Sequence, residues 1–433
     1  MSLLDKIRSR EARVGVLGLG HVGLPLSLEI ARAGYRVTGI DVDEARASLV
    51  QQGKSGLTEI PDGVVADLVG SGLLNSATNL EDGRRLDIFI ICVPTPLTSR
   101  REPDLSCISE AARSIAAHLR PGQMVILEST TFPGTTESEV RPILEQTGLS
   151  VGSEFYLAYS PERIDPGNQR YTIRNTPKIV AGVTDRCTEH ARSFYEQFVE
   201  KIVVVSSPKV AEMTKLFENV FRHVNVALAN ETMLVCEKMG LDVWEILDAA
   251  STKPFGFMPF YPGPGLGGHC IPVDPYYLLW KAREERCDVP LLRMAMRINE
   301  AMPGHVADRV AEKLAGRGKG LESAMILVVG VAYKRNLADV RESPAIRIIS
   351  LLAQRKAQVY YHDPLVPELC VDGKVYKSVS LDNYLLRQTD CAVIVTDHAS
   401  VDYGQIWNKV DLVVDTRGVG RSLPTQVSNP GAE

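Results

Sequence analysis

Residues 14–23 read VGVLGLGHVG, and this stretch decides the fold of the first part of the chain. An apolar run leads directly into Gly18, Gly20 and Gly23, and an amphipathic segment follows. Gly18 permits a tight turn, Gly20 lets the backbone approach a pyrophosphate, and Gly23 permits close packing of a helix on a strand. The spacing therefore predicts a strand, a turn and a helix whose N-terminus, with Val22 beside it, binds a dinucleotide.

An acid at the end of the next apolar run supports this interpretation and selects the type of dinucleotide. Asp41 lies eighteen residues after Gly23, where a carboxylate accepts from the ribose hydroxyls and repels a 2′-phosphate. We therefore expect NAD rather than NADP, with Arg46 on a solvated helix face. A tight turn without a ligand is the alternative, and the combination of strand, helix and acid argues against it.

The first half of the chain alternates short apolar runs with amphipathic segments. The expected strands are residues 13–17, 36–40, 87–93, 124–128, 178–183 and 202–206. Their nearly continuous apolar character predicts a parallel sheet that helices cover on both faces. Thr95 and Thr130 follow two of these strands, at the end of the sheet where ligands bind. Thr130 favours a place in the cofactor crevice, whereas Thr95 fits a simple turn equally well.

The second half begins with a long helix and ends with a second α/β pattern. Residues 211–239 contain no Gly or Pro, and Gly240 follows as a helix stop. Further strands are expected at residues 324–330, 358–361, 391–396 and 412–415. We predict an α/β fold with two doubly wound (Rossmann-like) domains joined by a long central helix. The expected domains are residues 1–207, 208–314 and 315–433.

Composition excludes several classes of function. The 433 residues carry a net charge of −5, and the scattered basic residues argue against a nucleic-acid surface. The N-terminus lacks the apolar core of a secretory signal, and no window approaches a membrane span. The eight cysteines are dispersed without CxxC pairs, which is typical of reduced thiols in a cytoplasmic protein without a metal site.

Residues 263–274, GPGLGGHCIPVD, form part of a loop rich in Pro and Gly, and such loops are usually functional. The glycines before Cys270 would leave its thiol unshielded and let backbone amides approach a ligand. A nucleophilic cysteine beside a dinucleotide fold indicates chemistry beyond one hydride transfer, because it can trap an aldehyde for a second oxidation. A buried structural cysteine remains an open alternative at this point.

Residues 211–219 read AEMTKLFEN and place Lys215 and Asn219 on one helix face, one turn apart. Spacing alone also fits a solvated polar stripe. The apolar side chains of this segment, however, predict that much of it is buried: Met213, Leu216, Phe217 and Val220. An unpaired buried lysine is costly, so Lys215 and Asn219 are candidates for stabilising an oxyanion.

The chain resembles the UDP-glucose/GDP-mannose dehydrogenase family over essentially its whole length. The matching motifs occur in the order GLGHVGLP, CVPTP, EST, SPER, AEMTKLFEN, GPGLGGHCIPVDP, GVAYKRNLADVRESP and VVDTRG. The resemblance implies an N-terminal NAD domain, a central dimerising helix and a C-terminal domain that binds a nucleotide sugar. It also implies a homodimer or a higher homo-oligomer.

The resemblance implies a role for each matching residue. Cys270 matches the nucleophile, and Lys215 with Asn219 matches the oxyanion-stabilising pair. Asp274 and Thr130 match the residues that activate and hold the hydrolytic water, and Glu162 belongs to the same network and to the substrate site. The remaining matches are Arg341 near the cofactor and, for substrate binding, Tyr261, Gly265, Gly267, Lys334 and Arg417.

Two departures bear on the substrate. Relatives that oxidise UDP-glucose carry Lys where this chain has Val273, and a second Glu where it has Pro166. The chain is most similar to the branch that oxidises UDP-N-acetylglucosamine at C6, where His269 is typical. We therefore expect NAD-dependent, four-electron oxidation of a UDP-N-acetylhexosamine, with UDP-N-acetylglucosamine as the first choice. UDP-N-acetylmannosamine, UDP-N-acetylgalactosamine and UDP-glucose are alternatives.

Two further classes of function remain open. A two-electron β-hydroxyacid dehydrogenase has a similar N-terminal organisation, but it needs neither Cys270 nor a third domain. A sensor of nucleotide sugars would have no use for Cys270, Lys215 and Asp274 together. Both classes are therefore weaker interpretations of the same residues.

Overall fold

The computed structural model describes residues 1–423 except 82, 166 and 169. Pro166 and the last ten residues of the predicted C-terminal domain therefore lie outside the described residues. The chain forms two compact units, Met1–Glu218 with Tyr276–Cys287, and Asn219–Pro275 with Asp288–Glu433. The finer division into three domains stays a prediction.

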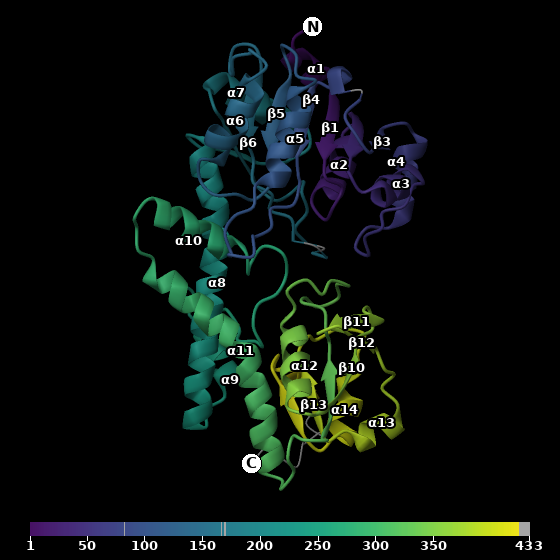
Figure 1. The fold of residues 1–433 in the computed structure, drawn as a ribbon, viewed down its shortest axis with the longest axis vertical. Helices are drawn as coiled ribbons and strands as arrows, with labels where there is room; N and C mark the ends of the chain where they lie inside the picture. Colours follow the sequence, from purple (N-terminus) through teal and green to yellow (C-terminus); the bar gives the residue numbers. More distant parts are fainter. Residues whose placement is uncertain (82, 166, 169, 424–433) are drawn as a thin grey trace. The chain divides into compact units, whose positions relative to one another are not determined.

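Within its described residues, the first unit is built around an eight-stranded sheet with the order β3-β2-β1-β4-β5-β6-β7-β8 (Figure 1). The strands are β1 (Arg13–Leu17), β2 (Arg36–Ile40), β3 (Leu74–Ala77), β4 (Ile88–Ile91), β5 (Met124–Leu127), β6 (Tyr156–Tyr159), β7 (Lys178–Gly182) and β8 (Ile202–Val204). Val14 of β1 is in parallel register with Val37 of β2 and Ile88 of β4. Strand order reverses at β1, which is the switch point where open α/β sheets bind ligands.

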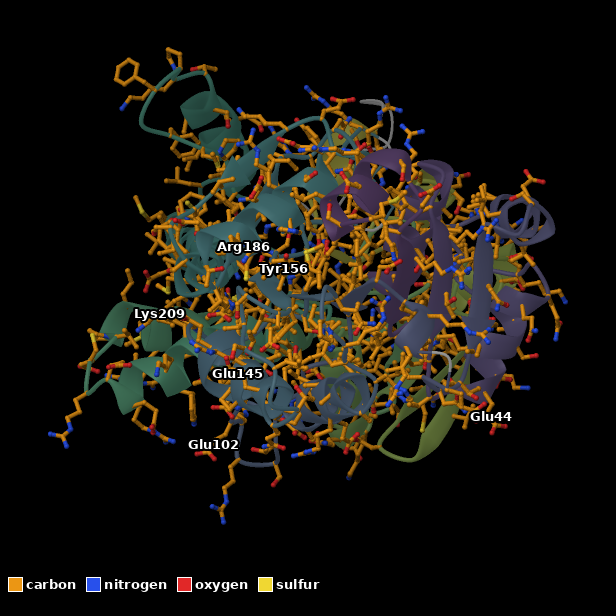
Figure 2. All side chains as sticks on the ribbon, turned by 90° about the horizontal axis from the view of Figure 1, so that it is seen from above. Glu44, Glu102, Glu145, Tyr156, Arg186 and Lys209 are labelled. Atoms are coloured by element: carbon orange, nitrogen blue, oxygen red, sulfur yellow. The ribbon has the colours of Figure 1, made fainter. Side chains whose placement is uncertain are left out.

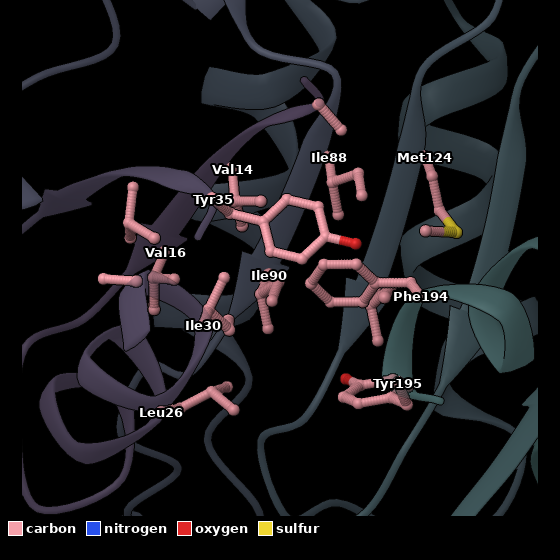
Figure 3. Close-up of a cluster of buried hydrophobic side chains, with 14 of the residues drawn as sticks. Val14, Val16, Leu26, Ile30, Tyr35, Ile88, Ile90, Met124, Phe194 and Tyr195 are labelled. Carbon is pink, nitrogen blue, oxygen red and sulfur yellow. The ribbon is translucent and has the colours of Figure 1, made fainter. Parts of the chain in front are cut away.

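Helices cover both faces of this sheet, as the apolar runs predict. One face packs on α2 (Gly23–Arg32) and α7 (Asp185–Tyr195), and the other packs on α5 (Ser106–Ala116) and α6 (Arg141–Glu145). Figure 3 shows the first of these cores, where the rings of Tyr35 and Phe194 meet edge to face at 5.6 Å. Three helices complete the unit, α1 (Leu3–Ser9), α3 (Glu44–Gln51) and α4 (Asp62–Gly70).

The far edge of the sheet corrects two expectations. β7 pairs antiparallel with β6, so the sheet is not parallel throughout. Parallel neighbours need a crossover of a dozen or more residues, usually a helix, and no helix lies between β6 and β7 in the described residues. β8 is parallel to β7 because α7 supplies that crossover. β8 is also an edge strand, and Val203 and Val204 are exposed rather than covered.

The second unit carries a smaller sheet, which in its described residues has the order β10-β9-β13-β14 and is parallel throughout. Its strands are β9 (Met325–Val329), β10 (Gln358–His362), β13 (Cys391–Ile394) and β14 (Val413–Asp415), with the hairpin β11 (Glu368–Val371) and β12 (Lys374–Lys377) beside them. One face packs on α12 (Pro344–Gln354) and the end of α11 (Pro290–Ala315), and the other packs on α13 (Asn383–Gln388) and α14 (Tyr403–Lys409). β10 is an edge strand with Tyr360 exposed, although the apolar run QVYY is typical of a buried strand.

The predicted long helix is α8 (Pro208–Met239), and Gly240 follows it with φ of +68°. Within the second unit α8 and α11 lie side by side (Figure 1), and α9 (Val243–Ser251) packs with them around Met302. The expected burial of α8 is only half correct. Leu216 and Val220 are buried, whereas Met213 and Phe217 are exposed.

Figure 2 shows Glu44 and Glu102 near the edge of the view, whereas Tyr156 and Arg186 lie next to one another, with the guanidinium 5.8 Å from the ring centroid. All eight cysteines lie within the described residues, and none of them forms a disulfide bond there. Among the described helices, none has the length and apolar character that crossing a membrane requires.

Candidate active site

Two of the three glycines of the first turn have a steric reason to be glycine, and the third lies beside open space. Gly18 has φ of +94°, and a Cβ there would lie 2.5 Å from the carbonyl oxygen of Cys92. A Cβ on Gly23 would lie 1.8 Å from the carbonyl oxygen of Gly18, so the helix packs directly on the turn. A Cβ on Gly20 would meet no atom within 4 Å, which leaves open space above the backbone. A pyrophosphate at the N-terminus of α2 fits this arrangement.

Asp41 lies at the carboxyl end of β2 and is buried. Its carboxylate accepts the amide N–H of Leu19 at 2.8 Å and that of Asp43 at 3.0 Å, which fixes it against the glycine turn. Each oxygen keeps a lone pair for a ribose hydroxyl. Arg46 lies on the exposed face of α3 as expected, and its guanidinium also lies 3.5 Å from the Asp41 carboxylate. This contact neutralises part of the charge that would repel a 2′-phosphate.

The two threonines that follow strands of the first unit lie in different surroundings. Thr95 is buried, and its carbonyl oxygen accepts the hydroxyl of Tyr277 at 3.0 Å. Thr130 is half-buried and begins the turn after β5. Glu212 of α8 holds that turn, because its carboxylate accepts the amide and the hydroxyl of Thr136 at 2.8 and 2.6 Å. Burial raises the pKa of Glu212.

Lys215 is buried and is anchored on the SPER segment. Its ammonium donates to the carbonyl oxygen of Glu162 at 2.7 Å and lies 3.8 Å from the Glu162 carboxylate. Arg163 of the same segment forms an ion pair with Glu218, also on α8. Lys215 is therefore buried, as the apolar neighbours predict, and it is paired with Glu162, while Arg163 and Glu218 form a neighbouring contact between the segment and the helix.

Cys270, Asp274 and Asn219 form a connected group within the second unit. The amide of Asp274 donates to the carbonyl oxygen of Cys270 at 2.8 Å, so the thiol lies one helical turn before the carboxylate. The Asn219 amide donates to the Asp274 carboxylate, and both residues are buried. Cys270 is half-buried, and its sulfur lies 3.9 Å from Nδ1 of His269. A thiol, an amide donor and a carboxylate thus occur together.

The glycines before Cys270 are required by packing against the protein itself. A Cβ on Gly267 would lie 2.6 Å from Cβ of Tyr333, and one on Gly268 would lie 2.8 Å from the Tyr333 ring. The amide of Gly268 donates to the carbonyl oxygen of Arg341 at 2.9 Å, so it is not available to a ligand as expected. The hydrogen bond to Asp339 raises the pKa of Arg341, and the charge of Cys270 adds a smaller effect in the same direction.

Four other predicted substrate residues lie in the second unit. Arg417 donates to the carbonyl oxygen of Val395 at 2.7 Å, and burial lowers the pKa of its guanidinium. A Cβ on Gly263 would lie 3.1 Å from this guanidinium. Tyr261 is exposed and stacks on Trp244 with 5.6 Å between ring centroids. Gly265 has φ of +124°, and Lys334 is half-buried in the loop after β9. Their roles toward a substrate stay predictions.

His223 is a residue that sequence reasoning missed. It is buried on α8, and its Nε2 has no hydrogen-bond partner among the described residues. Burial lowers the pKa of His223 from the ordinary 6.5, so the folded protein keeps the ring neutral. The unfolded chain then binds more protons below pH about 6.5, and His223 lowers the stability of the fold as the pH falls below that value.

Replacing His223 by Gln is therefore expected to flatten the loss of thermal stability between pH about 7 and about 5, because an acid-titrating group is removed. Melting temperatures of the parent and the variant across this range test the expectation. Equal slopes for the two proteins would contradict it. Burial also lowers the pKa of His190 in the first unit. His190 contributes equally to the pH dependence of the parent and of the variant, because both contain it.

Comparisons with known proteins agree with this arrangement. The sequence matches three domains of the UDP-glucose/GDP-mannose dehydrogenase family: its NAD binding domain over residues 12–199, its central domain over 209–301 and its UDP binding domain over 327–422. The chain is 36% identical to UDP-N-acetyl-D-glucosamine 6-dehydrogenase of Pseudomonas aeruginosa, across 82% of this chain and 84% of that protein.

Two further relatives carry other names. NDP-N-acetyl-D-galactosaminuronic acid dehydrogenase of Ralstonia nicotianae is 35% identical, across 94% of this chain and 96% of its own length. The structure of UDP-D-ManNAc dehydrogenase from Pyrococcus horikoshii superposes with a TM-score of 0.86 at 35% identity, covering 95% of this chain and 97% of that one. The resemblance and the NAD cofactor predicted from the sequence are confirmed. The chain belongs to the UDP-glucose/GDP-mannose dehydrogenase family, as an NAD-dependent nucleotide-sugar dehydrogenase.

Proposed function

We propose that the protein oxidises the C6 hydroxyl of a UDP-N-acetylhexosamine to a carboxylate, with Cys270 as the covalent nucleophile. The alcohol first loses a hydride from C6 and a proton from its oxygen, which gives an aldehyde. The Cys270 sulfur then bonds to C6 as a thiohemiacetal, and loss of a second hydride gives a thioester. Water breaks the C6–sulfur bond and leaves the carboxylate and the thiol. The balance is one alcohol, one water and two NAD⁺ to one carboxylate, two NADH and three protons.

NAD supplies the hydride acceptor for both oxidations, and Gly18, Gly20, Val22, Gly23 and Asp41 would hold it. Thr95, Thr130 and Arg341 are proposed as its further contacts. The open space above Gly20 and the fixed carboxylate of Asp41 support this assignment.

The other chain residues have proposed roles around the sugar. Lys215 and Asn219 stabilise negative charge on the C6 oxygen, because an ammonium and an amide both donate hydrogen bonds. Asp274 and Thr130 hold and activate the water that hydrolyses the thioester. Glu162 positions the Lys215 ammonium through its carbonyl oxygen and its carboxylate. The proposed substrate contacts are Tyr261, Gly265, Gly267, Lys334 and Arg417.

The observation that carries the proposal is the group around Cys270 in the second unit. The thiol precedes the Asp274 carboxylate by one helical turn, and the Asn219 amide reaches the same carboxylate. Arg341, which is paired with Asp339, also interacts electrostatically with Cys270.

We propose UDP-N-acetylglucosamine as the preferred substrate. Val273 and Pro166 differ from the residues typical of enzymes that oxidise UDP-glucose, and one relative is named for UDP-N-acetyl-D-glucosamine. The test is a panel of UDP-N-acetylglucosamine, its manno and galacto isomers and UDP-glucose, compared by kcat/KM. We expect the first to exceed UDP-glucose by about a hundredfold, since a site built for an amide leaves polar groups unpaired without it. A higher value for either isomer would reassign the sugar, and activity on none would refute the function.

We also propose a homodimer that forms through α8. Phe221, Leu228 and Val235 follow one another at seven-residue spacing on α8 and are exposed in the single chain. An apolar stripe of this kind marks an interaction surface. We expect a dimeric mass in sedimentation velocity, and Leu228→Lys shifts it to the monomer. A monomeric parent protein would contradict the proposal.

A further inference from the structure

A chain of buried side-chain amides crosses from α8 to α11 inside the second unit. Asn230 of α8 donates from Nδ2 to Oδ1 of Asn299 on α11 at 2.9 Å. Asn299 in turn donates from its own Nδ2 to the carbonyl oxygen of His223 at 3.0 Å, back on α8. Asn230 and Asn299 are 0% and 3% exposed, so the amides exchange hydrogen bonds with protein rather than with bulk water.

Both ends of this series of hydrogen bonds reach the loop that carries Cys270. At one end, the amide N–H of Gly263 donates to Oδ1 of Asn230 at 2.9 Å. At the other, Nδ1 of His223 lies 3.2 Å from the carbonyl oxygen of Ile271, which can only accept, so Nδ1 carries the proton. The two bonded backbone groups lie seven residues before and one residue after Cys270.

The loop has little regular structure to fix it otherwise. Residues 252–273 lie between the end of α9 and the start of α10 and contain no helix or strand. Irregular backbone is positioned by its individual hydrogen bonds, and buried side chains that bond to it restrict the arrangements it can adopt. A simple core would use apolar side chains at Asn230 and Asn299, since burying amides costs free energy without such a purpose.

We propose that Asn230, Asn299 and His223 are positioning residues that hold the Cys270 sulfur in its reactive place by fixing the loop on both sides of this residue. The inference rests on the proposed function only for the use made of the thiol. None of the three needs to touch substrate. Because misplacement of a reacting atom by about 1 Å can cost about a hundredfold in rate, loosening one end lowers kcat more than it raises KM.

The test compares Asn230→Ala, Asn299→Ala and the double variant with Asn225→Ala as a matched control. Asn225 lies on the same helix, but its amide donates within the helix to Phe221. Site-resolved mass spectrometry measures the rate at which iodoacetamide alkylates Cys270 in the full-length protein, with the exposed Cys287 and Cys370 as internal references. We expect a change of at least about threefold at Cys270 alone, and a fall in kcat of about tenfold with KM within about twofold.

The double variant distinguishes a connected chain from two separate sites. Residues of one network are not additive, so the double variant should alkylate no differently from the more affected single variant. If the effects of the two single variants on the alkylation rate multiply in the double variant, Asn230 and Asn299 act separately and the proposed network is refuted. If an alanine variant fails to fold, His223→Ala releases only the Ile271 end and gives the same readouts.

Unchanged alkylation of Cys270 together with unchanged kcat in folded variants would overturn the inference. If the proposed function is wrong, these experiments give a different pattern of results. In that case the alkylation of Cys270 still changes in the variants, while Cys270→Ser leaves the oxidation intact.

Discussion

Cys270→Ser is expected to lower complete oxidation of UDP-N-acetylglucosamine by about three orders of magnitude or more. A serine hydroxyl is far less acidic than a thiol, and it is therefore a weaker nucleophile near neutral pH. The aldehyde would therefore not be trapped, and the second hydride could not leave. Binding should persist because the change removes one sulfur atom from a loop whose backbone bonds remain.

Steady-state NADH formation and mass analysis of the product measure this effect. The matched control is Cys287→Ser, an exposed cysteine outside the proposed site, which should keep the parent rate. Cys92 should not replace the missing thiol, because burial and then the charge of Glu128 raise its pKa well above the ordinary value. Turnover to carboxylate within tenfold of the parent would remove Cys270 from the chemistry.

Lys178→Met is expected to destabilise the first unit by about 3–5 kcal/mol. The Lys178 ammonium lies 2.7 Å from the Glu128 carboxylate, and their side chains are 8% and 1% exposed. Tyr195 donates its hydroxyl to the same carboxylate. Removing the lysine leaves a buried negative charge that neither water nor a cation compensates, and this desolvation causes most of the loss.

Thermal and chemical denaturation of the variants measure the loss. Lys281→Met removes a more exposed pair of similar length, 3.0 Å to Glu285, and should cost less than about 1 kcal/mol. The double variant Lys178→Met with Glu128→Gln should recover part of the stability, since no charge is then buried. A Lys178→Met variant as stable as Lys281→Met would refute this account of the pair.

The fold was largely predictable because its central strands are buried on both faces and are therefore apolar without interruption. β1 and β2 begin and end at the predicted residues. β3 was missed because it is a four-residue edge strand, LNSA, with an exposed polar Asn75. The direction of β7 is set by the connection before it rather than by its own residues, so an apolar run could not reveal it.

The candidate site was predictable where a residue type has few other uses. The glycine turn and Asp41 satisfy steric and charge requirements that the sequence displays directly. Spacing could not show that Lys215 is anchored on the Glu162 carbonyl, because that contact joins residues far apart in the chain. The amides of Asn230 and Asn299 left only a weak signal, polar residues within largely apolar helices.

The most direct test of the central claim is the number of NADH molecules formed for each UDP-N-acetylglucosamine consumed to completion, with the product identified by mass spectrometry. A cysteine-bound route of two successive oxidations predicts two NADH and a uronate. One NADH with a free aldehyde would contradict it.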